Sequence, residues 1–117
     1  MKTHKDLIVW QKSLDYVTEI YQLTKSYPKD EIYGLANQLR RAAVSIPSNI
    51  AEGAARSTKN EFNQFLHISL GSLSELETQL LISENLGYLS KDDSIKKIEK
   101  LTEIRRTLLG LISSLEK

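Results

Sequence analysis

Apolar residues recur at gaps of three and four along nearly the whole chain, which is the spacing of one face of an α-helix. The first such stripe predicts a helix over about residues 6–26, with a buried face made of Leu7, Trp10, Leu14, Val17, Tyr21 and Thr24. This helix should end at Tyr27-Pro28, because a proline disfavours helical geometry in the residue before it. Asp30 then lies where the N-cap of a second helix is expected.

The second stripe keeps its phase through a proline, Pro47. It consists of Ile32, Leu35, Leu39, Ala42, Ile46, Ile50 and Gly53. A proline inside a helix costs about 3 kcal/mol, because it removes one hydrogen bond and crowds the carbonyl four residues earlier. Ser45, Ser48 and Asn49 are of the kind that can bond to the freed carbonyls. We therefore expect one helix over about residues 31–56, kinked at Pro47, with two separate helices as the alternative.

Capping motifs mark the two remaining helices. Thr58 and Glu61 fit a capping box and predict a helix over about residues 58–87 that ends at Gly87. Its expected buried stripe is Phe62, Leu66, Ser69, Leu73, Leu76, Leu80 and Ser83. Ser90 and Asp93 open the last helix, over about residues 91–116. Its expected apolar face is Ile95, Ile98, Leu101, Leu108, Ile112 and Leu115.

Four helices joined by short connections pack as antiparallel neighbours. The sequence thus predicts an all-α fold: a single domain over residues 1–117, folded as an up-down-up-down four-helix bundle. The five glycines and two prolines leave few of the turns that an all-β protein needs.

Composition limits the partners and the cellular compartment of the protein but indicates no particular reaction. The chain is 40% hydrophobic and 26% charged, and its net charge of +1 gives no overall attraction to nucleic acid or anionic lipid. Without cysteine, disulfides and thiolate sites are excluded, which fits an intracellular protein. The N-terminal apolar run Leu-Ile-Val-Trp is too short for a signal peptide, and no later stretch resembles a membrane span. We expect a cytoplasmic protein.

The usual signs of an enzyme or metalloprotein do not occur. The two histidines are His4 and His67, and Gln64 stands where a Glu-x-x-His metal motif needs glutamate. No serine sits in a nucleophile elbow, and no glycine-rich phosphate loop occurs. Glu75 and Glu77, two residues apart, face different sides of their helix. The expectation is a non-enzymatic protein without cofactor, metal or evident small-molecule substrate.

The most distinctive polar residues surround Pro47. Ser45, Asn49, Glu52 and Arg56 are spaced by four, three and four, so they share a helix face next to the apolar stripe, with Ser48 beside them. Polar groups placed there need partners, and the candidates are Gln38, Ser72 and Gln79. A structural hydrogen-bond network is the first interpretation, a contact between subunits the second, and a ligand or RNA pocket the third.

Basic residues form two groups along the chain. The first, Arg40, Arg41, Arg56 and Lys59, is the candidate RNA-contacting set. The second comprises Lys91, Lys96, Lys97, Lys100, Arg105 and Arg106. Acidic residues are interleaved with both groups, as is typical of solvated helix faces, whereas RNA binding needs several unpaired cations on one surface.

Three segments resemble one bacterial family: "YGLANQLRRAAVSIPSNIAEG", "EFNQFLHISLGSLSELETQL" and "LGYL". With Trp10 and Tyr27-Pro28, they make residues 7–90 similar to the four-helix-bundle proteins encoded in intervening sequences of 23S ribosomal RNA genes. The resemblance implies an antiparallel bundle that assembles into a ring, typically a homopentamer, and no catalytic activity. A similar relative is the accessory protein of diversity-generating retroelements, a basic pentameric bundle that binds nucleic acid and a reverse transcriptase.

These observations together predict a non-enzymatic, oligomeric bundle that serves as an assembly or scaffold module. The alternative is an RNA-binding accessory protein that uses modest basic patches, repeated around a pentameric ring, through avidity.

Overall fold

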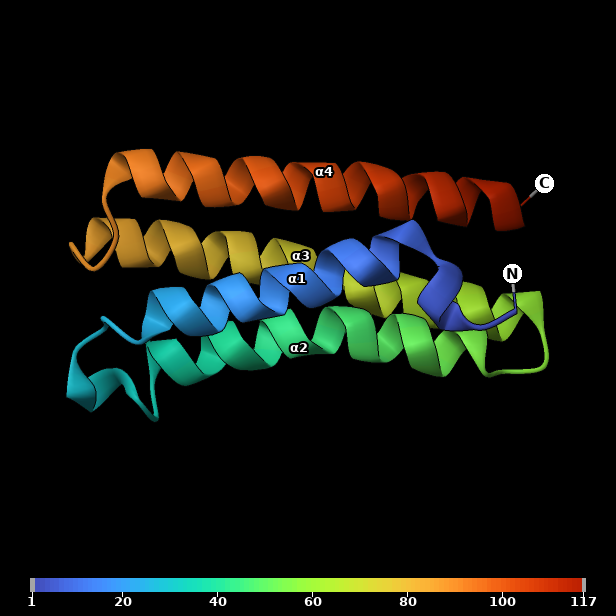
Figure 1. The fold of residues 1–117 in the computed structure, drawn as a ribbon, viewed down its shortest axis with the longest axis horizontal. Helices are drawn as coiled ribbons and strands as arrows, with labels where there is room; N and C mark the ends of the chain where they lie inside the picture. Colours follow the sequence, from blue (N-terminus) through green and yellow to red (C-terminus); the bar gives the residue numbers. More distant parts are fainter. Residues whose placement is uncertain (1, 117) are drawn as a thin grey trace.

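The computed structural model describes residues 2–116, which form four α-helices and two short 3₁₀-helices without any strand. The α-helices are α1 (Ile8–Thr24), α2 (Leu35–Ala54), α3 (Lys59–Asn85) and α4 (Lys91–Leu115). The 3₁₀-helices are η1 (His4–Asp6) and η2 (Lys29–Glu31). Figure 1 shows the helices side by side along the long axis of a 43 × 24 × 19 Å molecule, with the two termini at the same end. The all-α prediction of four helices is confirmed.

The predicted caps of α3 and α4 are present. The Thr58 Oγ1 accepts a hydrogen bond from the backbone N–H of Glu61 at 3.1 Å, and Ser90 Oγ accepts one from Asp93 N–H, also at 3.1 Å. Gly87 follows α3 with a φ of 78°, the left-handed conformation that glycine adopts without strain. The backbone N–H of Tyr88 then bonds back to the carbonyl of Ser83 at 2.9 Å, which closes the helix end as a Schellman turn.

The prediction for the start of α2 is wrong. Asp30 lies in η2, and α2 begins only at Leu35 with no side-chain cap on Gly34. Glu31 takes over the capping role: one carboxylate oxygen accepts from the Leu35 N–H at 3.2 Å, and the other accepts from the Tyr88 hydroxyl at 2.9 Å. A carboxylate in this position is also favourable for the helix dipole. As a result, residues 32–34 form a turn at the surface and Ile32 is exposed.

Pro47 lies inside one continuous α2, so the alternative of two separate helices is wrong. The kink at this proline stays a prediction. The stripe on both sides of Pro47 faces the core as expected, from Leu35 to Gly53, and only Ile32 falls outside it.

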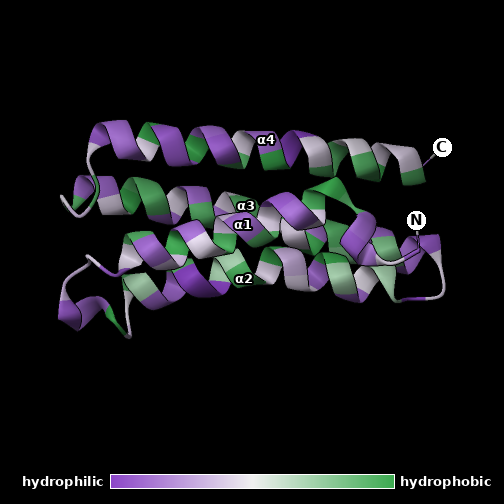
Figure 2. Ribbon diagram, in the orientation of Figure 1, coloured by the Kyte–Doolittle hydropathy of each residue, from purple (hydrophilic) through white to green (hydrophobic). Residues whose placement is uncertain are grey.

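The hydrophobic core follows the predicted stripes of α3 and largely that of α4. All seven α3 positions are buried. In α4, Leu101, Leu108 and Ile112 are buried and Ile98 and Leu115 pack against the core, whereas Ile95 is exposed. Figure 2 shows the resulting alternation of hydrophobic and hydrophilic residues along each helix. No helix within residues 2–116 is long and apolar enough to cross a lipid bilayer.

The predicted buried face of α1 is wrong by part of a turn. The residues that α1 buries are Val9, Ser13, Tyr16, Ile20 and Thr24, of which only Thr24 was expected. Leu14 and Tyr21 are exposed instead, and Trp10 and Val17 are partly buried at the edge of the core. α1 carries apolar residues on two adjoining stripes, and the Tyr16 hydroxyl fixes the rotation by donating to the Lys97 carbonyl of α4 at 2.9 Å.

Candidate functional site

A hydrogen-bond network beside Pro47 joins α2 to α3. The hydroxyls of Ser45 and Ser72 share a hydrogen bond of 2.8 Å. Asn49 Nδ2 donates to the carbonyl of Ser45 at 2.7 Å and to its hydroxyl at 2.9 Å. Ser69, fully buried on α3, donates to the carbonyl of Ile46 at 2.9 Å. Ser72 therefore lies where a partner for the polar set was expected.

This network does not replace the hydrogen bond that Pro47 removes. The carbonyl four residues before Pro47 belongs to Ala43. The side chains of Asn49 and Ser69 instead bond to the carbonyls of Ser45 and Ile46, just before the proline. The network thus connects two helices across their interface and supplies hydrogen-bond partners to Ser45, Asn49, Ser69 and Ser72.

The rest of the polar set is spread over other surfaces. Ser48 is exposed and lines a groove on the opposite side of α2, toward α1. Glu52 and Arg56 form an exposed ion pair of 3.0 Å, and the Arg56 guanidinium lies 4.8 Å from the centre of the Phe65 ring. The five predicted residues therefore do not form one site.

An apolar groove runs between α1 and α2. It has a volume of about 360 Å³, and its walls include Trp10, Leu14, Val17, Val44, Pro47 and Ala51. Leu14 is 44% exposed and Val44 is 39% exposed. The spacing of apolar residues in α1 predicts that Leu14 is buried in the core of the bundle. This spacing identifies Leu14 as part of an apolar stripe but does not show which way the stripe faces.

A polar groove lies on the other side of α2, against α3. It has a volume of about 490 Å³ and is lined by Tyr33, Asn37, Gln38, Arg41, Ser45, Glu75 and Gln79. Gln79 is only 6% exposed, and its side-chain oxygen has no hydrogen-bond partner among residues 2–116. Gln38 and Gln79 were expected to bond to the polar set around Pro47, yet they lie in this groove and make no such bond. No sequence pattern predicts this groove, because its lining residues come from two helices and the turn before α2.

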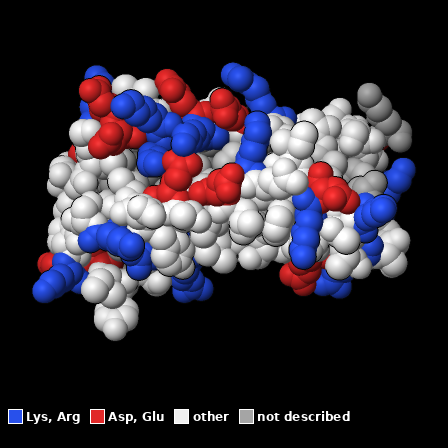
Figure 3. Space-filling view, in the orientation of Figure 1, with Lys and Arg blue, Asp and Glu red and all other residues white. Residues whose placement is uncertain are grey.

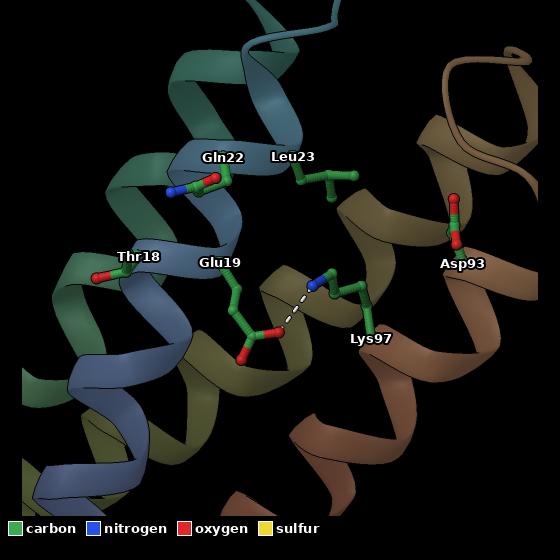
Figure 4. A pocket seen from close by; sticks show the side chains of 6 residues that line it. All are labelled: Thr18, Glu19, Gln22, Leu23, Asp93 and Lys97. Carbon is green, nitrogen blue, oxygen red and sulfur yellow. Dashed lines mark hydrogen bonds and ion pairs between the residues drawn. The ribbon is translucent and has the colours of Figure 1, made fainter.

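A third groove lies between α1 and α4, and ion pairs cross it. Glu19 Oε1 accepts hydrogen bonds from Lys97 Nζ and Lys100 Nζ, each at 2.8 Å. Figure 4 shows Glu19 and Lys97 pointing toward each other from the two helices, with Leu23 on the same side of α1 and Gln22 pointing away from the pair. Figure 3 shows how closely lysine, arginine and acidic side chains are interleaved on this face.

Two ionisable residues that link α1 to α4, Glu19 and Tyr16, have shifted pKa values. Burial acts to raise the pKa of Glu19, but the hydrogen bonds and charges of Lys100 and Lys97 outweigh it and lower the pKa overall. Burial raises the pKa of Tyr16, and the nearby Glu19 carboxylate adds to this shift. Glu19 is thereby kept ionised and Tyr16 protonated, which are the forms in which they bond to Lys97 of α4.

The basic residues of the predicted RNA-contacting set lie at two ends of α2. Arg40 Nε donates to Thr24 Oγ1 at 2.8 Å, and its guanidinium lies 4.7 Å from the centre of the Tyr21 ring. Arg41 is exposed next to it, whereas Arg56 lies in the connection after α2 and Lys59 opens α3. At a rise of about 1.5 Å per residue, Arg41 lies roughly 20 Å along the axis from Ala54, where α2 ends. The four side chains therefore form two pairs, not one patch.

The two histidines lie on different elements, His4 in η1 and His67 in α3. The His4 ring packs edge-on against Trp10 with a centroid distance of 5.0 Å, and His67 is exposed on α3. Within residues 2–116, no three His, Cys, Asp or Glu side chains are grouped closely enough to hold a metal ion.

Comparison with known proteins assigns the chain to a family. The family model of 23S rRNA-intervening sequence proteins matches residues 5–110. The fold is similar to the crystal structure of a protein with unknown function from the S23 ribosomal protein family of Bacteroides thetaiotaomicron. That protein is 25% identical, the TM-score is 0.82, and the alignment covers 90% of this chain and 98% of that chain. No curated protein matches the chain. The chain belongs to the family of 23S rRNA-intervening sequence proteins.

Proposed function

We propose that this protein is a non-enzymatic assembly module of the cytoplasm, which associates with copies of itself into a ring of five subunits. The apolar groove between α1 and α2 carries this proposal. The groove has an apolar surface formed by Trp10, Leu14, Val17 and Val44. The buried core of the bundle consists of other residues, so this surface is not part of it. Exposed apolar side chains gathered on one face form a surface that another protein can cover.

The double stripe of α1 supports self-association as the use of this surface. Val9, Tyr16 and Ile20 face the bundle core, while Leu14 and Tyr21, on the adjoining stripe, stay exposed. One helix thus has more apolar surface than its own bundle covers. Burying such surface in a subunit contact is favourable by about 25 cal/mol for each Å² of apolar area. The number five comes from the family resemblance.

The mass of the protein in solution tests the proposal. Size-exclusion chromatography with light scattering at micromolar concentration should give about five times the subunit mass of 13.3 kDa. A stable monomer under these conditions would overturn the assembly role.

A charge placed in the groove tests which surface is used. Leu14→Lys should shift the assembly toward monomers without unfolding the bundle, because Leu14 is already 44% exposed. Leu109→Lys is the matched control, since Leu109 is 45% exposed but lies on α4, away from the groove. If Leu14→Lys keeps the wild-type mass, the α1/α2 groove is not the contact between subunits.

RNA binding through basic patches on the ring is the alternative function. It has less support, because Arg40 and Arg56 already contact neighbouring side chains and the net charge is +1. Repetition around a ring would multiply the remaining exposed cations, Arg41 and Lys59. Filter binding of structured ribosomal RNA over a salt series is the test: no salt-dependent slope at low ionic strength would remove this alternative.

A further inference from the structure

We infer that the polar groove between α2 and α3 binds a guanine nucleotide, either free or as an unpaired residue of an RNA strand. The volume of about 490 Å³ lies within the range of roughly 300–1,000 Å³ that is usual for small-ligand sites. The inference does not depend on self-association, because all the residues that line the groove belong to one subunit.

The first observation is the unsatisfied amide of Gln79. This side chain is 94% buried by residue area, and its Oε1 has no hydrogen-bond partner within the described part of the chain. Leaving a buried polar group unpaired costs about 1–3 kcal/mol. Gln79 lines the groove, so a ligand that offers a hydrogen bond there can recover this loss. In the neighbouring network, Ser45 and Asn49 have their partners.

The second observation is the charge on the two walls. Glu75 lines the groove from α3 and Arg41 lines it from α2, and neither makes an ion pair with a residue of the described chain. A carboxylate only accepts hydrogen bonds and a guanidinium only donates them. The groove is therefore suited to a ligand with a donor edge toward α3 and an anionic or acceptor group toward α2.

Guanine is the nucleobase that fits the α3 wall. Its N1–H and N2 amino group are adjacent donors, which a single carboxylate can accept as a pair. Adenine, cytosine and uracil each present at least one acceptor in the corresponding positions of this edge. Glu75 would accept this pair, and Arg41 would bind the phosphate through a charge-assisted hydrogen bond.

Tyr33 adds a stacking surface at the mouth of the groove. Its side chain is 95% exposed in the turn before α2, four residues before Asn37. Stacking of an unpaired base on an exposed aromatic ring is a usual element of single-strand recognition and is worth about 1–3 kcal/mol per base. Within the groove, the amides of Asn37, Gln38 and Gln79 can reach the remaining polar edges of a base or ribose.

A peptide fits this groove less well. Peptides are bound by sheet edges, by apolar grooves, by aromatic-lined grooves for proline-rich segments, or by clusters of arginine. This groove has one arginine, one tyrosine and a mostly polar lining, and residues 2–116 contain no strand. The combination of one aromatic ring, one guanidinium, one carboxylate and several amides matches a nucleotide.

Isothermal titration calorimetry with the four nucleoside monophosphates is the test. We expect GMP to bind at least tenfold more tightly than AMP, CMP or UMP. Glu75→Gln should abolish this preference, because an amide offers one acceptor and one donor in place of two acceptors. Glu99→Gln, an exposed position on α4, is the matched control and should bind GMP as the wild type does. Equal binding of the four nucleotides, or an unchanged preference in Glu75→Gln, would overturn the inference.

Two further arms separate the sources of the ligand and a merely structural role. Tighter binding of UUGUU than of UUUUU shows that an unpaired guanosine in RNA is recognised, and the affinities of UUGUU and GMP show which source is bound more tightly. If neither GMP nor UUGUU binds, the inference is wrong. Gln79→Met removes the unpaired amide and keeps the shape of the side chain. It should make the free protein more resistant to urea and weaken GMP binding at least tenfold. Greater stability with unchanged binding would contradict a role of Gln79 in the site.

Discussion

α2 and α3 pack closely against each other at Gly53. A Cβ atom added to this glycine would lie 2.7 Å from the Phe65 Cβ, 3.0 Å from the Phe62 Cδ1 and 3.2 Å from the Phe62 carbonyl oxygen. Two of these atoms are fixed to the backbone of α3 or belong to it, so no side-chain rotation can make room. Gly53→Ala must therefore push the two helices apart.

The size of the effect follows from two opposing contributions. An alanine in a helix interior is favoured over glycine by about 1 kcal/mol, but Gly53 is the penultimate residue of α2, where the gain is smaller. Forcing an extra carbon into a close-packed contact costs about 1–3 kcal/mol. We expect Gly53→Ala to lower the free energy of unfolding by about 1–2 kcal/mol.

Gly71→Ala is the matched control. Gly71 lies in the middle of α3, and an added Cβ would meet nothing within 4 Å. Here only the helix preference acts, and the free energy of unfolding should rise by about 1 kcal/mol.

Urea unfolding followed by far-UV circular dichroism measures both variants, at one fixed protein concentration because association also stabilises the fold. The two variants should differ by about 2–3 kcal/mol, so with m-values of about 1–3 kcal/mol per molar urea their midpoints should differ by roughly 0.7–3 M. Coincident midpoints would refute the close approach of α2 and α3 at Gly53.

Three further changes test the contacts described above. Asn49→Ala should lower the free energy of unfolding by about 0.5–1.5 kcal/mol, because it removes both bonds to Ser45, whereas the exposed Glu52→Ala should stay within about 0.5 kcal/mol in the same urea assay. Ser90→Ala, which removes the α4 cap, should lower the melting temperature through a loss of about 0.5–2 kcal/mol. The pKa of Glu19 is lowered in the folded protein, so Glu19 stabilises the fold above the ordinary carboxyl pKa, and this stabilisation is lost as the pH falls through the lowered pKa. In an acid titration of the free energy of unfolding, Glu19→Gln should therefore lose less stability over this pH range than the wild type.

The sequence predicts helix ends well where a local motif makes them. Thr58 and Ser90 each cap a helix by accepting a hydrogen bond from the backbone N–H three positions later, and Gly87 adopts the left-handed conformation that ends α3. Each of these motifs lies within a few consecutive residues, so the sequence alone reveals it. The start of α2 is different, because Glu31 caps Leu35 while it also accepts a hydrogen bond from Tyr88. Tyr88 is far away in the sequence, and no local pattern records that contact.

The buried face of α1 shows a second limit of periodicity. Leu14 and Tyr21 have the spacing of a buried stripe, and so do Val9, Tyr16 and Ile20. Hydrophobic spacing identifies both stripes as apolar, but it does not say which one the other helices of the same subunit cover. That choice depends on contacts across the bundle, such as the bond from the Tyr16 hydroxyl to the Lys97 carbonyl.

The candidate site was only partly accessible to sequence reasoning. Ser45 and Asn49 were expected to need partners, and Ser72 is one of them. The polar groove, in contrast, joins Arg41 of α2 to Glu75 and Gln79 of α3. These residues come together only through the packing of two helices, and no spacing rule within one helix relates them.

α2 is a wall of both the apolar and the polar groove. Val44 faces the groove toward α1, and its neighbour Ser45 lines the groove toward α3. A displacement or rotation of α2 therefore changes the walls of both grooves together. An occupant of one groove that shifts α2 alters the affinity of the other groove for its own occupant, and such linkage is reciprocal: each occupant changes the affinity for the other by the same factor.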